Sequence, residues 1–233
     1  MIIESKKSEF NHFSSLANDW WSKNGKFKIL HDIQPLRIKY IKDTLNKSKL
    51  NKTKILDIGC GGGLISEGMS KLGADVTGID FVKENIKVAK LHAKKNNLKI
   101  NFLVKDFEKE KITSKFDVII IFEVLEHLND WEAFLKKIQM NLKKNGVLII
   151  STINKNLFSK FLTIDIGENF LNWIPSNTHN YYKFIKPEDL KNVLFSNHFK
   201  EIKFKGLNYD PFKFKWELNN NIKVNFFCSC ILS

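Results

Sequence analysis

The chain of 233 residues has few cysteines, few prolines and no long apolar run. Its three cysteines, Cys60, Cys228 and Cys230, form no C-x-x-C pair. This spacing indicates neither a disulfide framework nor a cysteine zinc site, and a reducing compartment fits best. No stretch of the sequence reaches the roughly 18 apolar residues of a membrane-spanning helix. The first residues, MIIESKKSEFNHF, contain no apolar signal core. We therefore expect a soluble, cytoplasmic protein.

Acidic residues are outnumbered by basic ones. The chain carries 38 lysines and arginines against 25 aspartates and glutamates, for a formal net charge of +13. Such a charge favours anionic partners, whether nucleic acid, anionic lipid or an acidic ligand. The other interpretation, given equal weight, is a lysine-rich composition of the whole surface. No RRM-like or KH-like pattern occurs, so we expect no nucleic-acid partner.

The arrangement of apolar residues indicates a single domain over residues 1–233, with a helical extension over 1–50 in which Pro35 is expected to open a second helix. From residue 54, short apolar runs alternate with amphipathic stretches, which predicts a parallel sheet with helices on both faces. The predicted strands are 54–59, 74–80, 100–106, 116–123 and 146–152, and the predicted helices are 63–72, 83–97, 131–144 and 187–197. Two later stretches, 199–207 and 222–230, are expected to pair in antiparallel fashion, and 153–182 is expected to be an insertion over the active site.

A glycine-rich turn, LDIGCGGG, follows the first predicted strand and opens a helix. Glycines at such a turn let backbone N–H groups approach a ligand closely. The order of acid and glycines is Asp57, Gly59, Gly61, Gly63, which does not match the G-x-G-x-x-G pattern of dinucleotide folds. Asp80 ends the second predicted strand, where a carboxylate can accept both hydroxyls of a ribose.

The strings DIGCGGG and GID resemble the class I S-adenosylmethionine-dependent methyltransferases over roughly residues 50–152. This resemblance implies a Rossmann-like α/β fold with a seven-stranded sheet containing one antiparallel strand. It also implies S-adenosylmethionine as cofactor, with the three glycines around its methionine end and Asp80 at its ribose. Asp106 would face the adenine amine, and Phe122 would line the cofactor cleft. Because the sulfonium is cationic, Asp57 and nearby aromatic rings suit its surroundings.

More distant stretches resemble the ubiquinone-biosynthesis O-methyltransferase family across nearly the whole chain. They are NDWWSKNGKFKILHDIQPLR (18–37), GIDFVKENIKVAKLHA (78–93), FEVLEH (122–127), STINKN (151–156) and THNYYKFIKPEDL (178–190). In that family the arginine of the P-L-R stretch contacts the carboxylate of the cofactor, and Arg37 occupies that position here. The forked guanidinium suits this role because it can bind a carboxylate through two hydrogen bonds.

The family resemblance implies methyl transfer to a phenolic oxygen of polyprenylated catechol or hydroquinol intermediates, of the 2-polyprenyl-6-hydroxyphenol and 3-demethylubiquinol type. A phenol with a pKa near 10 is ionised in about one molecule in a thousand at pH 7. Making the phenolate fully available requires roughly 4 kcal/mol. A base, a cation or both must supply that free energy.

The stretch FEVLEH provides candidates for this role. Glu123, Glu126 and His127 follow a strongly apolar strand, and a helical turn there would place all three side chains on one face. Two carboxylates and an imidazole suit Mg²⁺ or Mn²⁺, and histidine ligands also allow Zn²⁺. We expect His179 to be the fourth ligand. The same E-x-x-E-H string occurs in metal-dependent small-RNA 2′-O-methyltransferases, and that activity is the alternative function.

Two metal-free interpretations of FEVLEH stay open. In the first, His127 acts alone as a general base. In the second, the stretch is structural, with Glu123 holding the cofactor loop and Glu126 capping a helix.

The segment 155–175 is rich in apolar and aromatic residues, and Lys155 and Lys160 lie within it. It is too short to span a bilayer, but it suits the interface of an anionic membrane. We expect peripheral contact with the inner face of the membrane and association with other enzymes of the ubiquinone pathway. The alternative is an insertion that packs over the active site.

Overall fold

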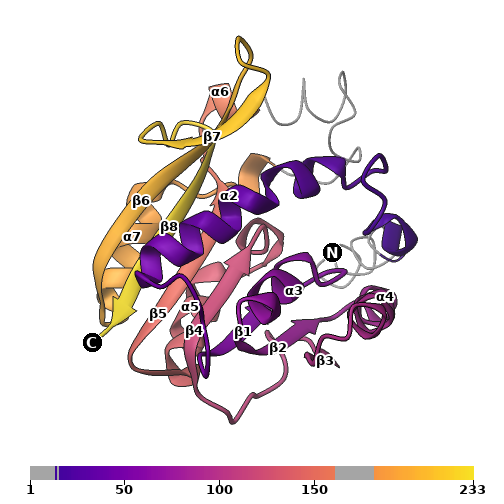
Figure 1. The fold of residues 1–233 in the computed structure, drawn as a ribbon. Helices are drawn as coiled ribbons and strands as arrows, with labels where there is room; N and C mark the ends of the chain where they lie inside the picture. Colours follow the sequence, from indigo (N-terminus) through magenta and orange to yellow (C-terminus); the bar gives the residue numbers. More distant parts are fainter. Residues whose placement is uncertain (1–13, 15, 161–180) are drawn as a thin grey trace.

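The protein is described from a computed structural model, in which residue 14, residues 16–160 and residues 181–233 are placed (Figure 1). The strands of these residues form one mixed sheet in the order β3-β2-β1-β4-β5-β8-β6-β7. Their bounds are β1 (Lys54–Ile58), β2 (Asp75–Asp80), β3 (Asn101–Val104), β4 (Phe116–Phe122), β5 (Leu142–Ile153), β6 (Phe199–Asp210), β7 (Lys215–Asn219) and β8 (Asn225–Leu232). The expected Rossmann-like α/β fold is confirmed.

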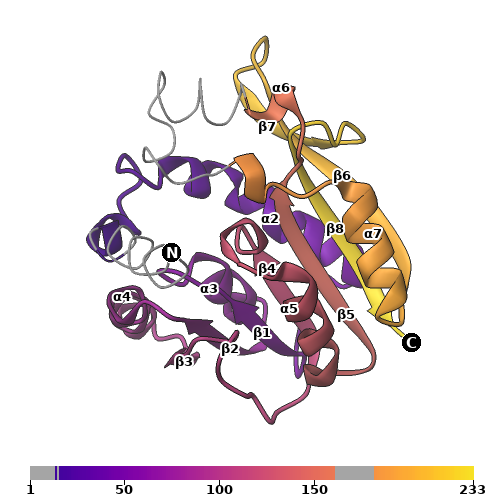
Figure 2. The ribbon, with the colours of Figure 1, turned by 180° about the vertical axis from the view of Figure 1, so that it is seen from behind.

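Helices cover both faces of the sheet. The helices are η1 (Ala17–Asp19), α2 (Lys28–Leu45), α3 (Leu64–Lys71), α4 (Lys83–Lys95), η2 (Leu125–His127), α5 (Trp131–Ile138), η3 (Gln139–Asn141), α6 (Leu157–Lys160), η5 (Tyr181–Lys183) and α7 (Pro187–Ser196). Helices α2 and α3 lie on the face seen in Figure 1, and their apolar side chains share a core with the sheet. Helices α5 and α7 lie on the opposite face, seen in Figure 2, over a second core. Burial on both faces explains why β4 is almost continuously apolar and why every residue of β1 after Lys54 is buried.

The carboxyl-terminal part of the sheet has one strand more than expected. Strand β8 is antiparallel to both β5 and β6, which confirms the pairing expected for 199–207 and 222–230. The additional strand is β7, which pairs with β6 as an antiparallel edge strand, so the described sheet has eight strands rather than seven. Strand β7 is five residues long, and a segment this short gives only a weak periodic signal in sequence.

Two helix boundaries differ from the expected ones. Pro35 lies inside α2 and does not open a separate helix. The buried face of α2 continues on both sides of the proline, so packing against the sheet outweighs the lost hydrogen bond. The helix expected over 131–144 ends as α5 at Ile138. Beyond it, the Asn141 side chain donates to the carbonyl oxygens of Ile112 (2.6 Å) and Ser114 (3.0 Å), which fixes the turn into β5.

Candidate active site

A cavity of about 810 Å³ opens where the parallel strands β1, β2 and β4 end. In open α/β sheets this is the edge at which ligands bind. The cavity is lined by nine of the residues singled out in the sequence: Arg37, Asp57, Gly59, Gly61, Asp80, Asp106, Phe122, Glu123 and His127. Gly63 and Glu126 do not line it, and His179 lies outside the described residues.

The glycine-rich turn takes a backbone conformation that favours glycine. The φ angles of Gly59, Gly61 and Gly63 are 69°, 53° and 89°. A Cβ atom on Gly61 would overlap the ring of Trp20, so a side chain there has no room. Gly63 instead faces Phe102. Because glycine has no side chain, α3 can pack closely against the sheet at this position. The predicted contact of Gly63 with the cofactor stays a prediction.

Two tryptophans cover this turn, a feature that sequence reasoning missed. Trp20 Nε1 donates to Asn85 Oδ1 at 2.9 Å, and Trp21 Nε1 donates to the carbonyl oxygen of Gly62 at 2.9 Å. Trp21 also stacks on His92, with ring centroids 3.3 Å apart. The W-W dipeptide was visible in the sequence, but Trp21 and Gly62 are 41 positions apart, so no local pattern predicts their contact.

Asp80 holds the glycine turn from the neighbouring strand. Its Oδ2 accepts the Gly61 N–H at 2.9 Å, and its Oδ1 accepts the Val82 N–H at 2.8 Å. Asn85 Nδ2 adds a longer hydrogen bond of 3.4 Å to Oδ1. Burial raises the pKa of Asp80 to about 6, and the backbone N–H groups oppose that rise. The carboxylate is thus oriented toward the cavity with its plane fixed.

Asp57 lies deeper in the same site, at the end of β1. The Ser66 hydroxyl donates to Asp57 Oδ2 at 2.6 Å, which ties the strand to α3. Burial raises the pKa of Asp57 to about 7, and the negative charge of Asp80 adds to the rise, while Ser66 and Arg37 oppose it. The site therefore concentrates negative charge beside the cavity, which suits a cationic ligand.

Arg37 and Glu123 form a partly buried ion pair between α2 and the end of β4. Arg37 Nη2 lies 3.0 Å from Glu123 Oε1, and the Arg37 side chain is 6% exposed. The Ser151 hydroxyl donates to the same Oε1 at 2.6 Å. The guanidinium also lies over the Phe122 ring, 5.3 Å from its centroid. Arg37 Nε is buried without a hydrogen-bond partner among the placed atoms, so one donor remains for a ligand.

Asp106 lies in the loop after β3, and it also lines the cavity. Its Oδ1 accepts the Glu108 N–H at 3.0 Å, and its Oδ2 lies 3.5 Å from Lys109 Nζ. These contacts hold the carboxylate in the loop that borders the cavity, which is compatible with its predicted role at the adenine amine.

The FEVLEH stretch does not form the regular helical turn on which its predicted shared face depended. The helical turn is a 3₁₀ turn over Leu125–His127, and Glu123 precedes it with a left-handed backbone (φ 54°). Glu126 does not line the cavity and is 2% exposed, with its Oε2 accepting the Thr152 hydroxyl at 2.9 Å. Glu123 and His127 do line the cavity. The Glu126 carboxyl group is nevertheless close enough to Glu123 for the two to interact.

Glu126 is an unusual carboxyl group in this position. Its Oε1 is buried without a hydrogen-bond partner in the placed structure. Burial raises the pKa of Glu126 well above its ordinary value, and the nearby Glu123 carboxylate raises it further. Burial at this position therefore favours the protonated form of the Glu126 carboxyl group. No group of three or more histidine, cysteine, aspartate or glutamate side chains within the placed residues could hold a metal ion.

The comparisons with known proteins identify this arrangement. A family model described as a methyltransferase domain matches residues 49–204. The chain is 45% identical over 228 residues to the ubiquinone biosynthesis O-methyltransferase of Pelagibacter ubique (strain HTCC1062), covering 94% of this chain and 95% of that protein. It is 41% identical over 223 residues to the protein of the same name from Rickettsia canadensis (strain McKiel), covering 95% and 94%. The chain belongs to the ubiquinone-biosynthesis O-methyltransferase family.

Membership of the ubiquinone-biosynthesis O-methyltransferase family confirms the enzyme class predicted from the sequence, an S-adenosylmethionine-dependent O-methyltransferase. The fold agrees with that assignment. The crystal structure of magnesium protoporphyrin IX methyltransferase from Synechocystis PCC 6803 with bound S-adenosylhomocysteine superposes with a TM-score of 0.72. That chain is 20% identical to this one, with 98% of this chain and 100% of that chain covered. At this identity the likeness concerns the fold.

Proposed function

We propose that the protein methylates phenolic hydroxyls of polyprenylated catechol or hydroquinol intermediates of ubiquinone biosynthesis. The observation that carries the proposal is the match of nearly the whole chain to ubiquinone biosynthesis O-methyltransferases at 40–45% identity. The predominantly apolar cavity supports it, because a phenol with a hydrocarbon tail requires such a lining. S-Adenosylmethionine, when bound, supplies an electrophilic methyl group on a sulfur that accepts the electron pair of the broken carbon–sulfur bond.

We place the cofactor against the glycine turn. Asp80 would accept the ribose hydroxyls, since each carboxylate oxygen that binds a backbone N–H keeps a second lone pair. Arg37 would bind the carboxylate of the cofactor, and its unpaired Nε supports this role. Gly59 and Gly61 would allow close approach of the methionine end, and Asp106 would face the adenine amine.

We propose His127 as the general base for the phenolic proton. His127 lines the cavity, whereas Glu126 does not line it and is buried, which raises the pKa of its carboxyl group well above the ordinary value. Lys183 Nζ donates to the backbone carbonyl oxygen of His127 at 3.1 Å, which steadies the turn. As the phenolic oxygen bonds to the methyl carbon, its proton moves to the imidazole. Glu126 and Thr152 then serve to hold the turn on β5.

The predicted metal site does not assemble from the placed residues alone. Arg37 already neutralises Glu123, and ionising Glu126 requires free energy because its pKa is raised. We therefore derive no step through a metal ion. A divalent cation held by Glu126, His127, Glu123 and His179 is the second form of this proposal, and the unpartnered Glu126 Oε1 supports it.

Turnover of a prenylated catechol with S-adenosylmethionine tests both forms. After exhaustive chelation, with the fold verified by circular dichroism, we expect full activity if His127 acts alone. Loss of activity that added Mg²⁺, Mn²⁺ or Zn²⁺ restores would instead establish the metal form. His127→Ala should lower kcat by about 10²- to 10⁴-fold. His198→Ala, which changes a histidine that does not line the cavity, is the matched control. Methylation of total RNA in place of the catechol would contradict the proposal.

Contact with a membrane is the remaining part of the proposed function. No helix in the placed part of the chain is long and apolar enough to cross a bilayer. We propose that residues 155–175 contact the inner face of the membrane, where a polyprenylated substrate resides, and that other enzymes of the pathway associate there. Within the placed part of this segment, Leu157 and Phe158 are 76% and 53% exposed. Residues 161–175 lie outside the described residues. Flotation of the protein with anionic vesicles tests this contact.

A further inference from the structure

The turn between β6 and β7 presents two phenylalanines to solvent. Phe212 is 93% exposed and Phe214 is 83% exposed, more than any other large apolar side chain in the described part of the chain. Figures 1 and 2 show this turn projecting beyond the rest of the molecule at the end opposite the C-terminus. Two exposed aromatic rings at a projecting tip require an explanation, because isolated exposure is normal but adjacent large apolar groups mark an interaction site.

The turn is held in shape rather than loosely attached. Asp210 Oδ1 accepts the N–H groups of Phe212 (2.9 Å) and Lys213 (3.2 Å), as in a side-chain-closed turn. Lys213 Nζ lies 2.9 Å from Asp210 Oδ2. Phe214 adopts a left-handed backbone (φ 50°), which bulky residues rarely take. These contacts fix the shape of the turn, and both phenyl rings remain exposed on it.

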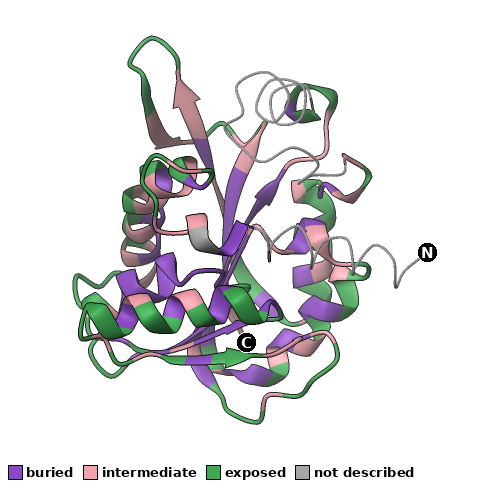
Figure 3. Ribbon diagram, turned by 90° about the vertical axis from the view of Figure 1, so that its right-hand side faces the viewer, coloured by how far each residue is buried: buried purple, intermediate pink, exposed green. Residues whose placement is uncertain are grey.

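The base of the same hairpin forms part of the active-site cavity. Tyr209, Pro211 and Trp216 line it, and so does Phe158 of α6. Figures 1, 2 and 3 place the β6–β7 turn and α6 at the same end of the molecule, and Figure 3 colours the tip of the turn as exposed. A surface that meets this tip would therefore lie beside the part of the cavity that the hairpin lines.

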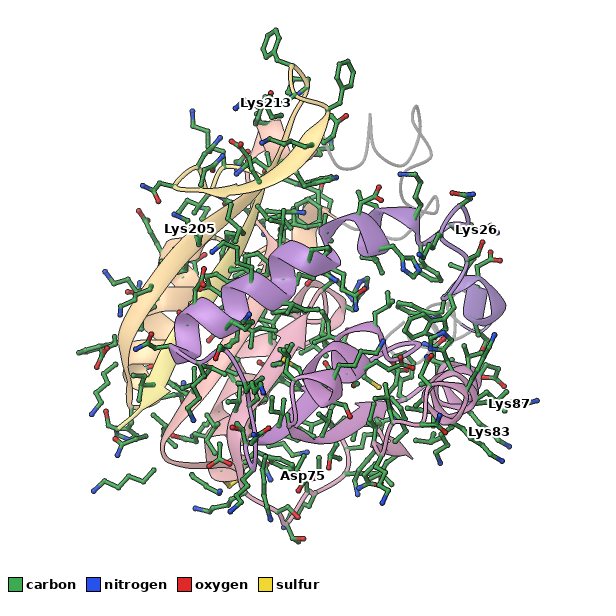
Figure 4. All side chains as sticks on the ribbon, in the orientation of Figure 1. Lys26, Asp75, Lys83, Lys87, Lys205 and Lys213 are labelled. Carbon is green, nitrogen blue, oxygen red and sulfur yellow. The ribbon has the colours of Figure 1, made fainter. Side chains whose placement is uncertain are left out.

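We propose that the turn Asp210–Lys215 docks into the interface of an anionic bilayer. The phenyl rings of Phe212 and Phe214 enter the boundary between headgroups and acyl chains, while Lys213 and Lys215 meet lipid phosphates. Figure 4 shows Lys213 at this projecting end, with Lys205 along the same hairpin. The net charge of +13 draws the whole protein to the same surface.

A lipid surface fits this tip better than a protein groove. The sequence P-F-K-F-K alternates apolar and basic groups on a convex turn, and residues 211–215 are all exposed. A fluid interface accepts apolar and cationic groups side by side without a preformed pocket, whereas a protein partner would need a cleft for each ring. The turn Asp210–Lys215 is a different part of the sequence from the segment 155–175. The proposed lipid contact does not depend on the proposed function. Only the advantage of that contact for methylating a prenylated substrate rests on that function.

Flotation of the full chain with vesicles tests the docking. We compare vesicles of pure phosphatidylcholine with vesicles that contain one third phosphatidylglycerol. The variant Phe212→Ser/Phe214→Ser should bind the anionic vesicles at least about tenfold more weakly than the unaltered protein. The matched control is Phe195→Ser on α7, which removes a 77% exposed phenylalanine just before β6 begins, at the other end of that strand. The control should bind like the unaltered protein.

Activity measurements separate this proposal from the function itself. Turnover of a short-chain, water-soluble catechol should be unchanged in Phe212→Ser/Phe214→Ser, which also shows that the variant folds. Turnover of a long-chain catechol in anionic vesicles should fall with vesicle binding. Equal vesicle binding by the variant and the unaltered protein would overturn the docking proposal, and so would failure of the unaltered protein to bind. If no catechol is methylated, the proposed function is wrong, while flotation still decides the docking.

Discussion

Asp80 offers a way to separate cofactor binding from folding. In the structure its two oxygens accept the N–H groups of Gly61 and Val82 at 2.9 and 2.8 Å. The change Asp80→Asn keeps one acceptor oxygen and turns an NH₂ group toward the other N–H. One charge-assisted hydrogen bond is lost, at a cost of about 1.5–3 kcal/mol.

The raised pKa of Asp80 offsets that loss in the ligand-free protein. Because burial raises the pKa from 3.8 to about 6, the folded state holds a proton that the unfolded state has released. The stabilisation from this proton is complete below pH 3.8 and is lost as the pH rises through 6. At 1.36 kcal/mol for each pKa unit, ionisation of Asp80 lowers the free energy of unfolding of the wild-type protein at pH 8 by roughly 3 kcal/mol relative to low pH. The asparagine variant cannot ionise at this position, so its free energy of unfolding has no such decrease. We therefore expect the two free energies of unfolding at pH 8 to agree within about 2 kcal/mol.

Cofactor affinity should respond quite differently. The proposed bonds to two ribose hydroxyls need two acceptor oxygens, and the amide leaves one hydroxyl unsatisfied. We expect a loss of about 2–4 kcal/mol in binding, or a dissociation constant roughly 30- to 1,000-fold higher.

Calorimetric titration with S-adenosylhomocysteine at pH 8 measures this change, and urea denaturation measures stability in the same buffer. Asp75→Asn is the matched control, since Asp75 is an exposed acid at the opposite end of β2 (Figure 4). An unchanged affinity in Asp80→Asn would refute the assignment of Asp80 to the ribose.

The remaining predictions concern the other buried charges. Arg37→Met should lower the free energy of unfolding by about 3–5 kcal/mol, because it leaves Glu123 uncompensated, and adding Glu123→Gln should recover part of the loss in urea denaturation. No recovery in the double variant would contradict the ion pair. Asp57→Asn should keep the hydrogen bond from Ser66. It should also remove the loss of folding free energy that ionisation of the buried Asp57 causes as the pH rises from 3.8 to about 7. Its stability relative to the wild-type protein should rise by up to about 4 kcal/mol over that interval. Parallel stability curves for the two proteins would show that Asp57 does not carry a raised pKa.

Much of the nucleotide side of the site was visible in the sequence. The positions of Asp57 and Asp80 at the ends of two strands follow from the apolar runs that precede them. Parallel neighbouring strands end at the same edge, so these acids had to meet there. Gly59 and Gly61 were predictable for a similar reason, because a glycine-rich turn between a strand and a helix is a local feature.

The backbone of FEVLEH differs from the helical turn assumed in the prediction, and the role of its residues in the site stays a prediction. Spacing alone treats Glu123, Glu126 and His127 as neighbours on a helix. In the folded chain, a left-handed Glu123 precedes a single 3₁₀ turn, and Glu126 is drawn inward by Thr152. The hydrogen bond from the buried Thr152 hydroxyl on β5 cannot be predicted from the local sequence around Glu126.

The sequence by itself determined the order of strands and helices, the glycine turn and the family, because these depend on periodicity and on residues near one another in the chain. Tertiary structure alone decided which partners the side chains of FEVLEH find elsewhere in the chain. Arg37 and Glu123 are 86 positions apart, and Glu126 and Thr152 are 26 apart. The covering of Gly61 by Trp20 and the display of Phe212 at the projecting hairpin were likewise settled only in the fold. Burial sets the pKa values of the acids and the exposure of the phenylalanines, and burial is a property of the packed molecule rather than of any segment.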